Sequence, residues 1–362
     1  MNIIDHHDLT GKPFLVNAVS FEDKKFINSD YCSVTISPLA IQNATGNSSS
    51  TDKENALLAS FGEYNERLNL FYNLNPKIPL LDGISLFDNK KIKINPANIY
   101  MNFSLRGLSE YHKEFTDSCG LASHLSSDLA LYSGISEFIE RQSLIATWVG
   151  KRAGNQYDIS TLPKDMKNKN IMNRFERIFS YFKLYDISIF SGVFVLLLLG
   201  INDKDFSIGV CASCSFSDAL CGALDEFQQS YESILLFHNS SQSRKQDRYK
   251  TSFLKQSPSE LKAKYLFLEQ MRPLKVSKEL SNDSNENKLF KLKKALRTIP
   301  LDYYAVAVVP SMRQINIRIV KIFSPDAFPH MNTEIINPRN YKITNFIGMN
   351  SFPNENQPLP FP

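Results

Sequence analysis

The sequence lacks the features of several protein classes. It has five cysteines, an odd number that does not indicate a disulfide framework. Cys211-x-x-Cys214 with Cys221 has no second cysteine pair or nearby histidine to complete a zinc site, so we expect small packing residues in a reducing, cytoplasmic compartment. No signal peptide is recognisable, because Met1–Asp5 contains no basic segment.

Strong charge and long apolar runs are also missing. The 41 Lys and Arg against 37 Asp and Glu give a net charge of +4, too small to indicate nucleic-acid binding. The longest apolar run, 187–201, contains two serines and two glycines and is shorter than the roughly 20 residues of a membrane span. We expect a buried strand there instead, with a turn at 200–203.

The predicted elements are mixed. The 362 residues, 43% of them hydrophobic, are enough to bury a core without disulfides. Strand-like runs rich in Val, Ile and Tyr occupy 185–199, 206–211, 303–309 and 315–323, and helical segments lie among them. No polar segment separates an independent domain. We therefore predict an α+β fold in which residues 1–362 form a single composite domain.

An internal repeat is the most informative feature, with copies near 46–70, 117–148 and 211–231. In each copy an alanine precedes a glutamate by seven residues, an aromatic residue follows that glutamate, and a second polar residue stands at i+3. The three sets are Ala56, Glu63 and Glu66; Ala130, Glu137 and Glu140; and Ala219, Glu226 and Gln229. This spacing places each set along one helix face. Thr51–Glu54 predicts a capping box at the start of the first helix.

Paired carboxylates on one helix face repel each other, and an arginine at i+4 relieves part of the repulsion. A single Glu-x-x-Glu-Arg is usually a surface ion pair, but two copies in one sequence frame indicate a shared site. Oxygen ligands suit Mg²⁺ or Ca²⁺ rather than zinc, and no copy has the Glu-x-x-His of di-iron bundles. Because Mg²⁺ usually accompanies a polyphosphate and no G-x-x-x-x-G-K-[ST] occurs, the pattern predicts a Mg-nucleotide site without a Walker loop.

Three motifs make this chain resemble the YcaO family. Ser60–Arg67 resembles the first nucleotide motif of the family, Asp117–Arg141 the second, and Ala223–Gln229 the third. The resemblance covers essentially the whole chain. It implies a YcaO-type fold with mixed sheets, in which three motif helices converge around ATP and Mg²⁺.

The resemblance also implies roles for individual residues. The metal ligands would be Glu63, Glu66, Glu137, Glu140 and Glu226. The nucleotide contacts would be Ser60, Arg67, Ser133, Arg141 and Gln229. The family commonly has a serine four residues before the first glutamate; this chain keeps it as Ser133 but has Ala59 in the first motif, which weakens the case for Ser60. His124 is a candidate proton carrier because of its pKa range, and a structural histidine is the alternative.

The C-terminal tail, residues 353–362, ends in Pro358-Leu-Pro-Phe-Pro362. It is similar to the tail of azoline-forming cyclodehydratases, which implies functional roles for Pro358, Pro360 and Pro362. A polyproline segment extends about 3 Å per residue, so it can reach toward a substrate at little entropic cost. The alternative is a frayed terminus.

The resemblance implies an ATP- and Mg²⁺-dependent cyclodehydratase. Such an enzyme phosphorylates a backbone amide oxygen of a ribosomal precursor peptide and forms thiazoline or oxazoline rings from Cys, Ser or Thr, as in bacteriocin biosynthesis. The implied partners are the precursor peptide, a separate E1-like or ThiF-like leader-binding protein and, in a multi-enzyme synthetase, an FMN dehydrogenase. The alternatives are a thioamide-forming YcaO enzyme and a non-catalytic YcaO-like scaffold that binds peptide and partner.

Overall fold

The chain folds into two compact units, neither of which is continuous in sequence. The computed structural model describes residues 4–7, 13–23, 32–38, 45–72, 80–100, 117–162, 169–239, 253–270, 273–276, 288–308 and 316–362. Unit 1 contains Met1–Arg141 and Pro300–Met331, and unit 2 contains Gln142–Ile299 and Asn332–Pro362. That the whole chain forms one composite domain stays a prediction.

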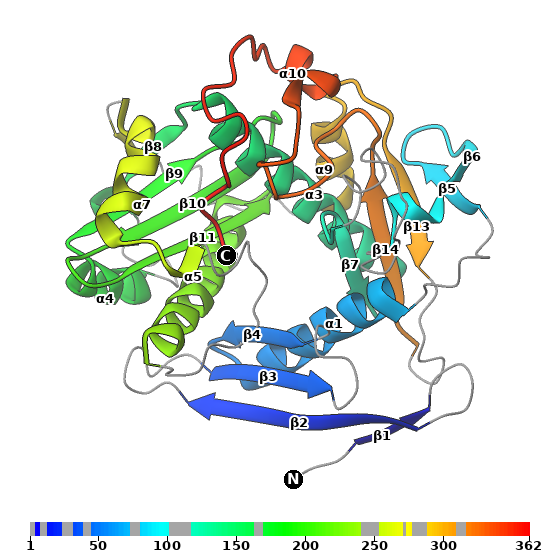
Figure 1. The fold of residues 1–362 in the computed structure, drawn as a ribbon, viewed down its shortest axis with the longest axis horizontal. Helices are drawn as coiled ribbons and strands as arrows, with labels where there is room; N and C mark the ends of the chain where they lie inside the picture. Colours follow the sequence, from blue (N-terminus) through cyan, green and yellow to red (C-terminus); the bar gives the residue numbers. More distant parts are fainter. Residues whose placement is uncertain are drawn as a thin grey trace. The chain divides into compact units, whose positions relative to one another are not determined.

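Unit 1 is built from two antiparallel sheets (Figure 1), with strand orders β1-β2-β3-β4 and β6-β5-β13-β14-β7. Its elements are β1 (Ile4–His7), β2 (Pro13–Asp23), β3 (Cys32–Pro38), β4 (Gly46–Ser50), α1 (Lys53–Tyr72), β5 (Leu81–Ser85), β6 (Lys91–Ile94), β7 (Leu121–His124), β13 (Tyr304–Val308) and β14 (Arg318–Phe323). Helix α3 (Ser127–Gly150) contributes its residues up to Arg141 to this unit.

The start of α1 differs from the sequence prediction. Thr51 was expected to head a capping box, but the carboxylate of Asp52 accepts hydrogen bonds from the backbone amides of Glu54 (2.8 Å) and Asn55 (3.2 Å). The prediction of Thr51 as the cap is therefore wrong. A carboxylate can accept both free amides of the first turn and also interacts favourably with the positive end of the helix.

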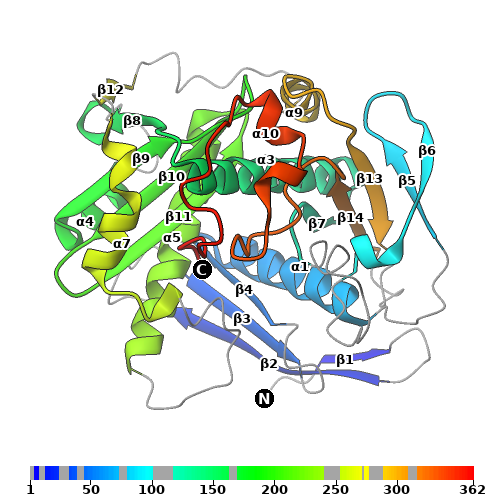
Figure 2. The same ribbon diagram turned by 45° about the horizontal axis from the view of Figure 1, so that its top comes forward.

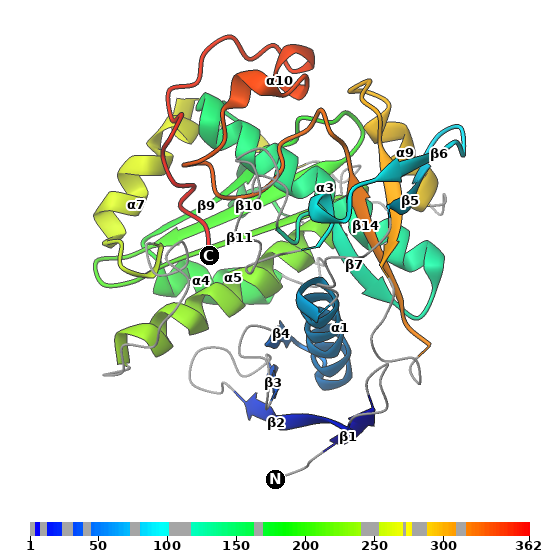
Figure 3. The same ribbon diagram turned by 45° about the vertical axis from the view of Figure 1, so that its right-hand side comes forward.

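Helix α1 covers one face of the first sheet (Figures 1 and 3). The buried side chains of this contact are Cys32, Val34 and Ile36 of β3 and Ala56, Tyr64 and Leu68 of α1. Gly46 allows β4 to approach the helix backbone, because a Cβ at this position would lie 2.0 Å from the carbonyl oxygen of Ser60. The Ser60 hydroxyl in turn donates to the Gly46 carbonyl at 2.9 Å.

We expect Gly46→Ala to lower the free energy of unfolding by roughly 1–3 kcal/mol, the usual range for overpacking a core. The added methyl group would meet backbone atoms of both Ser60 and Tyr64, so the strand and the helix must separate. Thermal unfolding measures the effect. Gly62→Ala is the control, because its Cβ would meet only the Ser123 hydroxyl, at 3.2 Å. Equal unfolding temperatures for Gly46→Ala and the unmodified protein would contradict the close approach.

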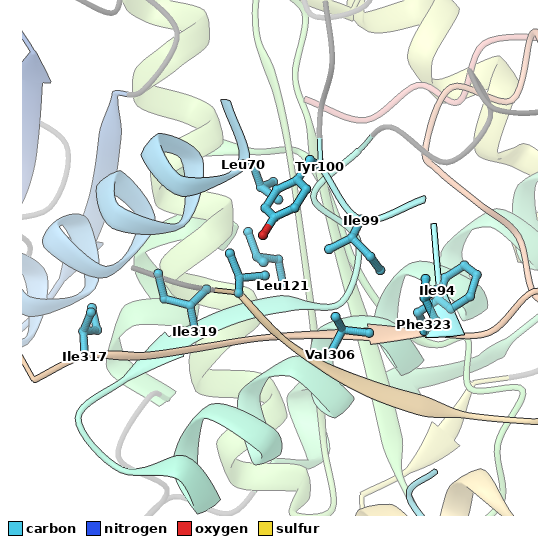
Figure 4. Packing of buried hydrophobic residues seen from close by; sticks show 10 residues of the cluster. Leu70, Ile94, Ile99, Tyr100, Leu121, Val306, Ile317, Ile319 and Phe323 are labelled. Atoms are coloured by element: carbon cyan, nitrogen blue, oxygen red, sulfur yellow. The ribbon is translucent and has the colours of Figure 1, made fainter. Parts of the chain in front are cut away.

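The second sheet lies between a hydrophobic cluster and α3. Figure 4 shows the cluster, whose buried members are Leu70, Ile94, Ile99, Tyr100, Leu121, Val306, Val308, Ile317, Ile319 and Phe323. Alternate residues of β14, Val320 and Ile322, approach Gly134 of α3, where a Cβ would lie 3.2 Å from Ile322 Cγ1. This packing places the first half of α3 beside β14 and β7.

Unit 2 is built around one five-stranded sheet of order β11-β10-β9-β8-β12, antiparallel except for the β8–β12 pair. Its elements are the rest of α3, β8 (Asn155–Asp158), α4 (Lys169–Ile178), β9 (Tyr181–Asp186), β10 (Phe194–Ile201), β11 (Phe206–Ser213), α5 (Phe216–Asn239), α7 (Pro258–Tyr265), β12 (Leu274–Lys275), α9 (Lys288–Leu296) and α10 (Ile343–Phe346).

The apolar run at 187–201 is not one strand. Its buried strand, β10, begins only at Phe194, and the residues before it connect β9 to β10. The carboxylate of Asp186 accepts hydrogen bonds from the amides of Ser188 (3.0 Å) and Val195 (3.3 Å), and Gly192 has a φ of +82°. Local hydrogen bonding by Asp186 thus forms a hairpin inside a run that looks continuous by hydropathy.

Helix α5 covers β10 and β11 (Figure 2). Gly209 of β11 repeats the role of Gly46, because a Cβ there would lie 2.2 Å from the Ala223 carbonyl oxygen and 2.4 Å from the Phe227 amide nitrogen. Phe227 is fully buried, and its ring packs edge to face on those of Phe175 (4.9 Å) and Phe179 (5.4 Å) of the α4 region. These contacts fix the orientation of α5 on its sheet.

The α+β prediction is confirmed, since helices and mostly antiparallel sheets are mixed in both units. Within the described ranges, no helix has the length and hydrophobicity needed to cross a membrane. The five cysteines are free thiols.

Candidate functional site

The three motif helices follow their strands in a repeated geometry. A glycine stands 17 residues before the first glutamate of each copy, namely Gly46, Gly120 and Gly209. In the first copy the next backbone amide, that of Asn47, donates to a carboxylate oxygen of Glu63. In the third copy Val210 N donates to Glu226 Oε2 at 2.7 Å. Each of these glutamates is therefore oriented by the strand that precedes its helix.

The three copies also share a pattern of burial. The alanines Ala56, Ala130 and Ala219 are at most 1% exposed, and the aromatic residues after the first glutamates, Tyr64, Phe138 and Phe227, are buried as well. The first glutamates themselves are only partly buried. The aromatic residue therefore anchors each helix, and the carboxylate one position earlier keeps access to a ligand.

On α1, Glu63 and Arg67 form an ion pair with 2.6 Å between Glu63 Oε1 and Arg67 Nη2. Arg67 also donates to the carbonyl oxygen of Thr45 at 2.7 Å. The guanidinium group is thus held beside the carboxylate and next to the start of β4, where it can contact an anionic ligand.

Glu66, one turn further along α1, contacts β7. Its carboxylate accepts a hydrogen bond from Ser123 N at 2.6 Å, and the Ser123 hydroxyl donates to the Gly62 carbonyl at 3.2 Å. Burial raises the pKa of Glu66 to about 7; hydrogen bonds from Ser123 lower it, and the charge of Glu63 raises it further. The carboxylate is therefore held in place by hydrogen bonds but is poorly solvated.

The carboxylates of α3 join this group. Arg141 Nε lies 3.4 Å from Glu140 and 3.8 Å from Glu137. Burial raises the pKa of Glu137 well above its usual value; Arg141 opposes this, while the negative charge of Glu66 adds to it. Glu66 of α1 and Glu137 of α3 thus lie near enough within unit 1 for the charge of one to influence the pKa of the other.

Sequence reasoning missed a buried cation in unit 1. Lys321 of β14 is 4% exposed, and its ammonium group donates to the Asp117 carbonyl oxygen. Burial lowers the pKa of Lys321, and the charges of Asp117, Cys119 and Glu137 oppose that shift. With Asn98, Lys321 lines a cavity of about 20 Å³, enough for a water molecule. A lone lysine in the apolar run Arg318–Phe323 was the available signal.

Asp117 organises the loop before β7. Its only predicted role is as the first residue of the second motif. Its carboxylate accepts hydrogen bonds from the amides of Cys119 (2.7 Å) and Met331 (3.0 Å). These contacts join the loop that leads into the second motif to the segment after β14.

Three other predicted residues belong to unit 1. Ser60 is fully buried and its hydroxyl donates to Gly46, so we leave it out of the proposed site. Ser133 is partly buried on α3, one turn before Glu137. His124 is exposed, and its Nδ1 accepts a hydrogen bond from Ser126 N at 3.2 Å. Its role as a proton carrier stays a prediction.

The remaining predicted residues belong to unit 2. Glu226 and Gln229 are both partly buried on α5. Between them in sequence, Gln228 points to the core and donates to Glu232 at 2.8 Å, a buried pair that the repeat pattern did not predict. The convergence of all three motif helices on one nucleotide stays a prediction.

The tail of unit 2 is packed rather than frayed. Leu359 and Phe361 are each 1% exposed, and Phe361 N donates to the Leu359 carbonyl at 2.9 Å, which closes a γ-turn centred on Pro360. A polyproline helix has no internal hydrogen bonds, so the tail departs from that extended conformation at Pro360. The roles of Pro358, Pro360 and Pro362 stay predictions.

The carboxylates of unit 1 fit Mg²⁺ by donor type. Mg²⁺ prefers oxygen ligands and usually binds one or two carboxylates together with substrate phosphates. Among the described residues, no three His, Cys, Asp or Glu side chains form a ready-made metal cage. The desolvated Glu66 and Glu137 would gain from a divalent cation, and Arg67 and Arg141, now paired with glutamates, could turn to phosphates.

Several solved structures have a similar fold. The chain matches the E. coli microcin synthetase McbBCD complex with pro-MccB17 bound over 100% of both chains, with 18% identity and a TM-score of 0.76. It matches YcaO from Methanopyrus kandleri bound with AMPPCP and Mg²⁺ with 13% identity and a TM-score of 0.67, covering 90% of this chain and 89% of that one. A heterocyclase in complex with substrate and cofactor matches with 12% identity and a TM-score of 0.72, over 92% of this chain and 52% of the other.

The TM-scores show a shared fold, and the predicted YcaO-type fold is thereby confirmed. A comparison with curated protein sequences gave no match. The family model described as YcaO cyclodehydratase, ATP- and Mg²⁺-binding, matches residues 69–327, which is most of the chain. The protein therefore belongs to the YcaO family and is an ATP- and Mg²⁺-dependent cyclodehydratase of that family.

Proposed function

We propose that this enzyme activates backbone amides of a ribosomal precursor peptide and closes thiazoline or oxazoline rings. The observation that carries the proposal is that the two Glu-x-x-Glu-Arg motifs, on α1 and α3, both place partly buried carboxylates and ion-paired arginines in unit 1. Burial raises the pKa of both Glu66 and Glu137. Arg67 pairs with Glu63 on α1, and Arg141 pairs with Glu137 and Glu140 on α3. Carboxylates of this kind can bind a magnesium ion, and the arginines can bind the phosphates of a nucleoside triphosphate.

The proposed reaction has three steps. The side chain of a substrate Cys, Ser or Thr attacks the carbonyl carbon of the preceding amide and gives up its proton. The resulting oxyanion accepts the γ-phosphoryl group of ATP, which leaves ADP. The amide nitrogen then loses its proton, phosphate departs, and a carbon–nitrogen double bond forms within the ring that the first step closed.

The roles we assign to the residues are binding and charge compensation, which dominate phosphoryl transfer in general. Glu63, Glu66, Glu137, Glu140 and Glu226 would hold Mg²⁺, which supplies neutralisation of the phosphate charge when bound. Arg67, Arg141, Ser133 and Gln229 would contact the nucleotide. The tail, with Pro358, Pro360 and Pro362, would line the side on which the peptide lies.

We also propose that the enzyme acts with other proteins. Supporting this, the similar E. coli chain comes from a synthetase complex that was solved with pro-MccB17 bound. The partners we propose are a precursor peptide, an E1-like or ThiF-like protein that binds its leader, and an FMN dehydrogenase subunit that would oxidise the rings.

Mass spectrometry tests the proposed chemistry. The enzyme would be incubated with MgATP, with a short Cys/Ser/Thr-rich peptide encoded beside its gene, and with the partner protein from the same neighbourhood. We expect the peptide to lose the mass of one water for each ring. A gain equal to the difference between sulfur and oxygen would show a thioamide-forming enzyme instead. An unchanged mass with no ATP consumption would favour a non-catalytic scaffold.

A further inference from the structure

The end of the tail has few backbone hydrogen-bond donors. Proline has no amide proton, so within residues 358–362 only Leu359 and Phe361 carry backbone donors. The amide of Phe361 is used inside the γ-turn at Pro360. Besides the burial of Leu359 and Phe361, the turn is therefore oriented by outside donors that reach the carbonyl oxygens of the tail.

Three side chains of unit 2 supply such donors. Tyr265 Oη donates to the Pro360 carbonyl at 3.0 Å, whereas Trp148 Nε1 (3.2 Å) and Thr333 Oγ1 (2.5 Å) both donate to the Gln357 carbonyl. The contacts of Trp148 and Thr333 hold the approach to the turn. The contact of Tyr265, at the end of α7, holds the turn itself; Figure 3 shows the C-terminal segment in red and α7 in yellow.

Tyr265 is itself firmly placed. It is 1% exposed, and its ring packs against those of Trp148, at 6.2 Å between centroids, and Phe267, at 6.4 Å. Helix α7, which carries it, begins with a complete capping box formed by Ser257 and Glu260. A hydroxyl on a packed ring at the end of a capped helix has little freedom, so it can fix the carbonyl that it contacts.

We propose that Tyr265 is a positioning residue for the tail, and that its hydrogen bond to Pro360 sets the orientation of the last residues toward the peptide substrate. The inference rests on the proposed function, because it gives the tail a place on the substrate side. A displacement of about 1 Å is enough to reduce a catalysed step roughly 100-fold, so one lost hydrogen bond at the turn has a measurable effect.

The test is Tyr265→Phe, which keeps the ring and removes the hydroxyl. We expect ring formation to fall at least about 10-fold in kcat. The KM for ATP and the basal ATP hydrolysis should be unchanged, so more ATP is consumed per ring. Tyr157→Phe is the matched control, because Tyr157 is a buried tyrosine of the same unit that packs on Phe216. An unchanged ratio of ATP to rings in Tyr265→Phe overturns the proposal.

A second measurement separates this inference from the proposed function. Tyr265→Phe should lower the unfolding temperature of the full chain but have no further effect in a variant that lacks residues 358–362. Equal decreases with and without the tail would show that Tyr265 acts elsewhere. If the chain forms no rings under any condition, the proposed function fails, while the coupling of unfolding temperatures still decides whether Tyr265 orders the tail.

Discussion

A Glu66→Gln variant is expected to lose ATP hydrolysis by roughly 100- to 1,000-fold, the usual cost of removing one preorganised charge-stabilising group. The glutamine still accepts the hydrogen bond from Ser123, so the fold around α1 and β7 should persist. The substitution removes only the negative charge with which, we propose, Glu66 binds Mg²⁺ at the nucleotide site. A change in KM for ATP alone, with kcat unchanged, would place Glu66 in ground-state binding instead.

The same variant should unfold at an equal or higher temperature above pH 7. Burial raises the pKa of Glu66 from 4.5 to about 7 in the folded protein. A raised pKa means that its contribution to stability is fully present below about pH 4.5 and is lost as the pH rises to about 7. The variant has no such charge to ionise. Loss of activity together with unchanged or higher stability distinguishes a functional carboxylate from a structural ion pair.

Glu54→Gln is the matched control for this experiment. It makes the same chemical change at an exposed position in the first turn of α1. We expect it to retain ATP hydrolysis, measured at saturating Mg²⁺ with thermal unfolding in parallel. Full activity in both variants would remove Glu66 from the nucleotide site and with it the main support for the proposed function.

Much of this site could be predicted because the repeat is recognisable from the spacing of its residues. The helix period relates Ala56, Glu63 and Glu66, and two further copies showed that the spacing was not accidental. The structure confirms helices at all three copies and buries the alanine of each. Charge and donor type then limited the ligands to hard cations and polyphosphates.

Other features depend on contacts that spacing does not encode. Lys321 meets Asp117 across 204 positions of the chain, and Ser123 meets Glu66 across 57. The repeat pattern does not reveal the glycine of the third copy. That copy is predicted near 211–231, whereas Gly209 is the residue that lies against α5. Close approach of two backbones is a tertiary requirement, and a glycine inside a strand is its only mark in the sequence.

Removing residues 358–362 is expected to leave basal ATP hydrolysis near its original rate and to reduce ring formation by at least about 100-fold. The carboxylates and arginines that we assign to magnesium and phosphate in unit 1 belong to α1 and α3 and not to the tail. The tail would act on the peptide, whose amide must lie close to the γ-phosphate. Parallel measurements of ADP release and peptide mass separate the two activities.

Deletion also removes two buried side chains, Leu359 and Phe361, each worth about 1.5–3 kcal/mol of hydrophobic stabilisation. A variant with Pro358→Ala, Pro360→Ala and Pro362→Ala keeps those side chains and relaxes only the backbone restriction of the prolines. If tail geometry matters, this variant should lose most ring formation with a smaller decrease in unfolding temperature than the deletion. Ring formation at the original rate in both variants would show that the tail stabilises unit 2 and takes no part in placing the peptide.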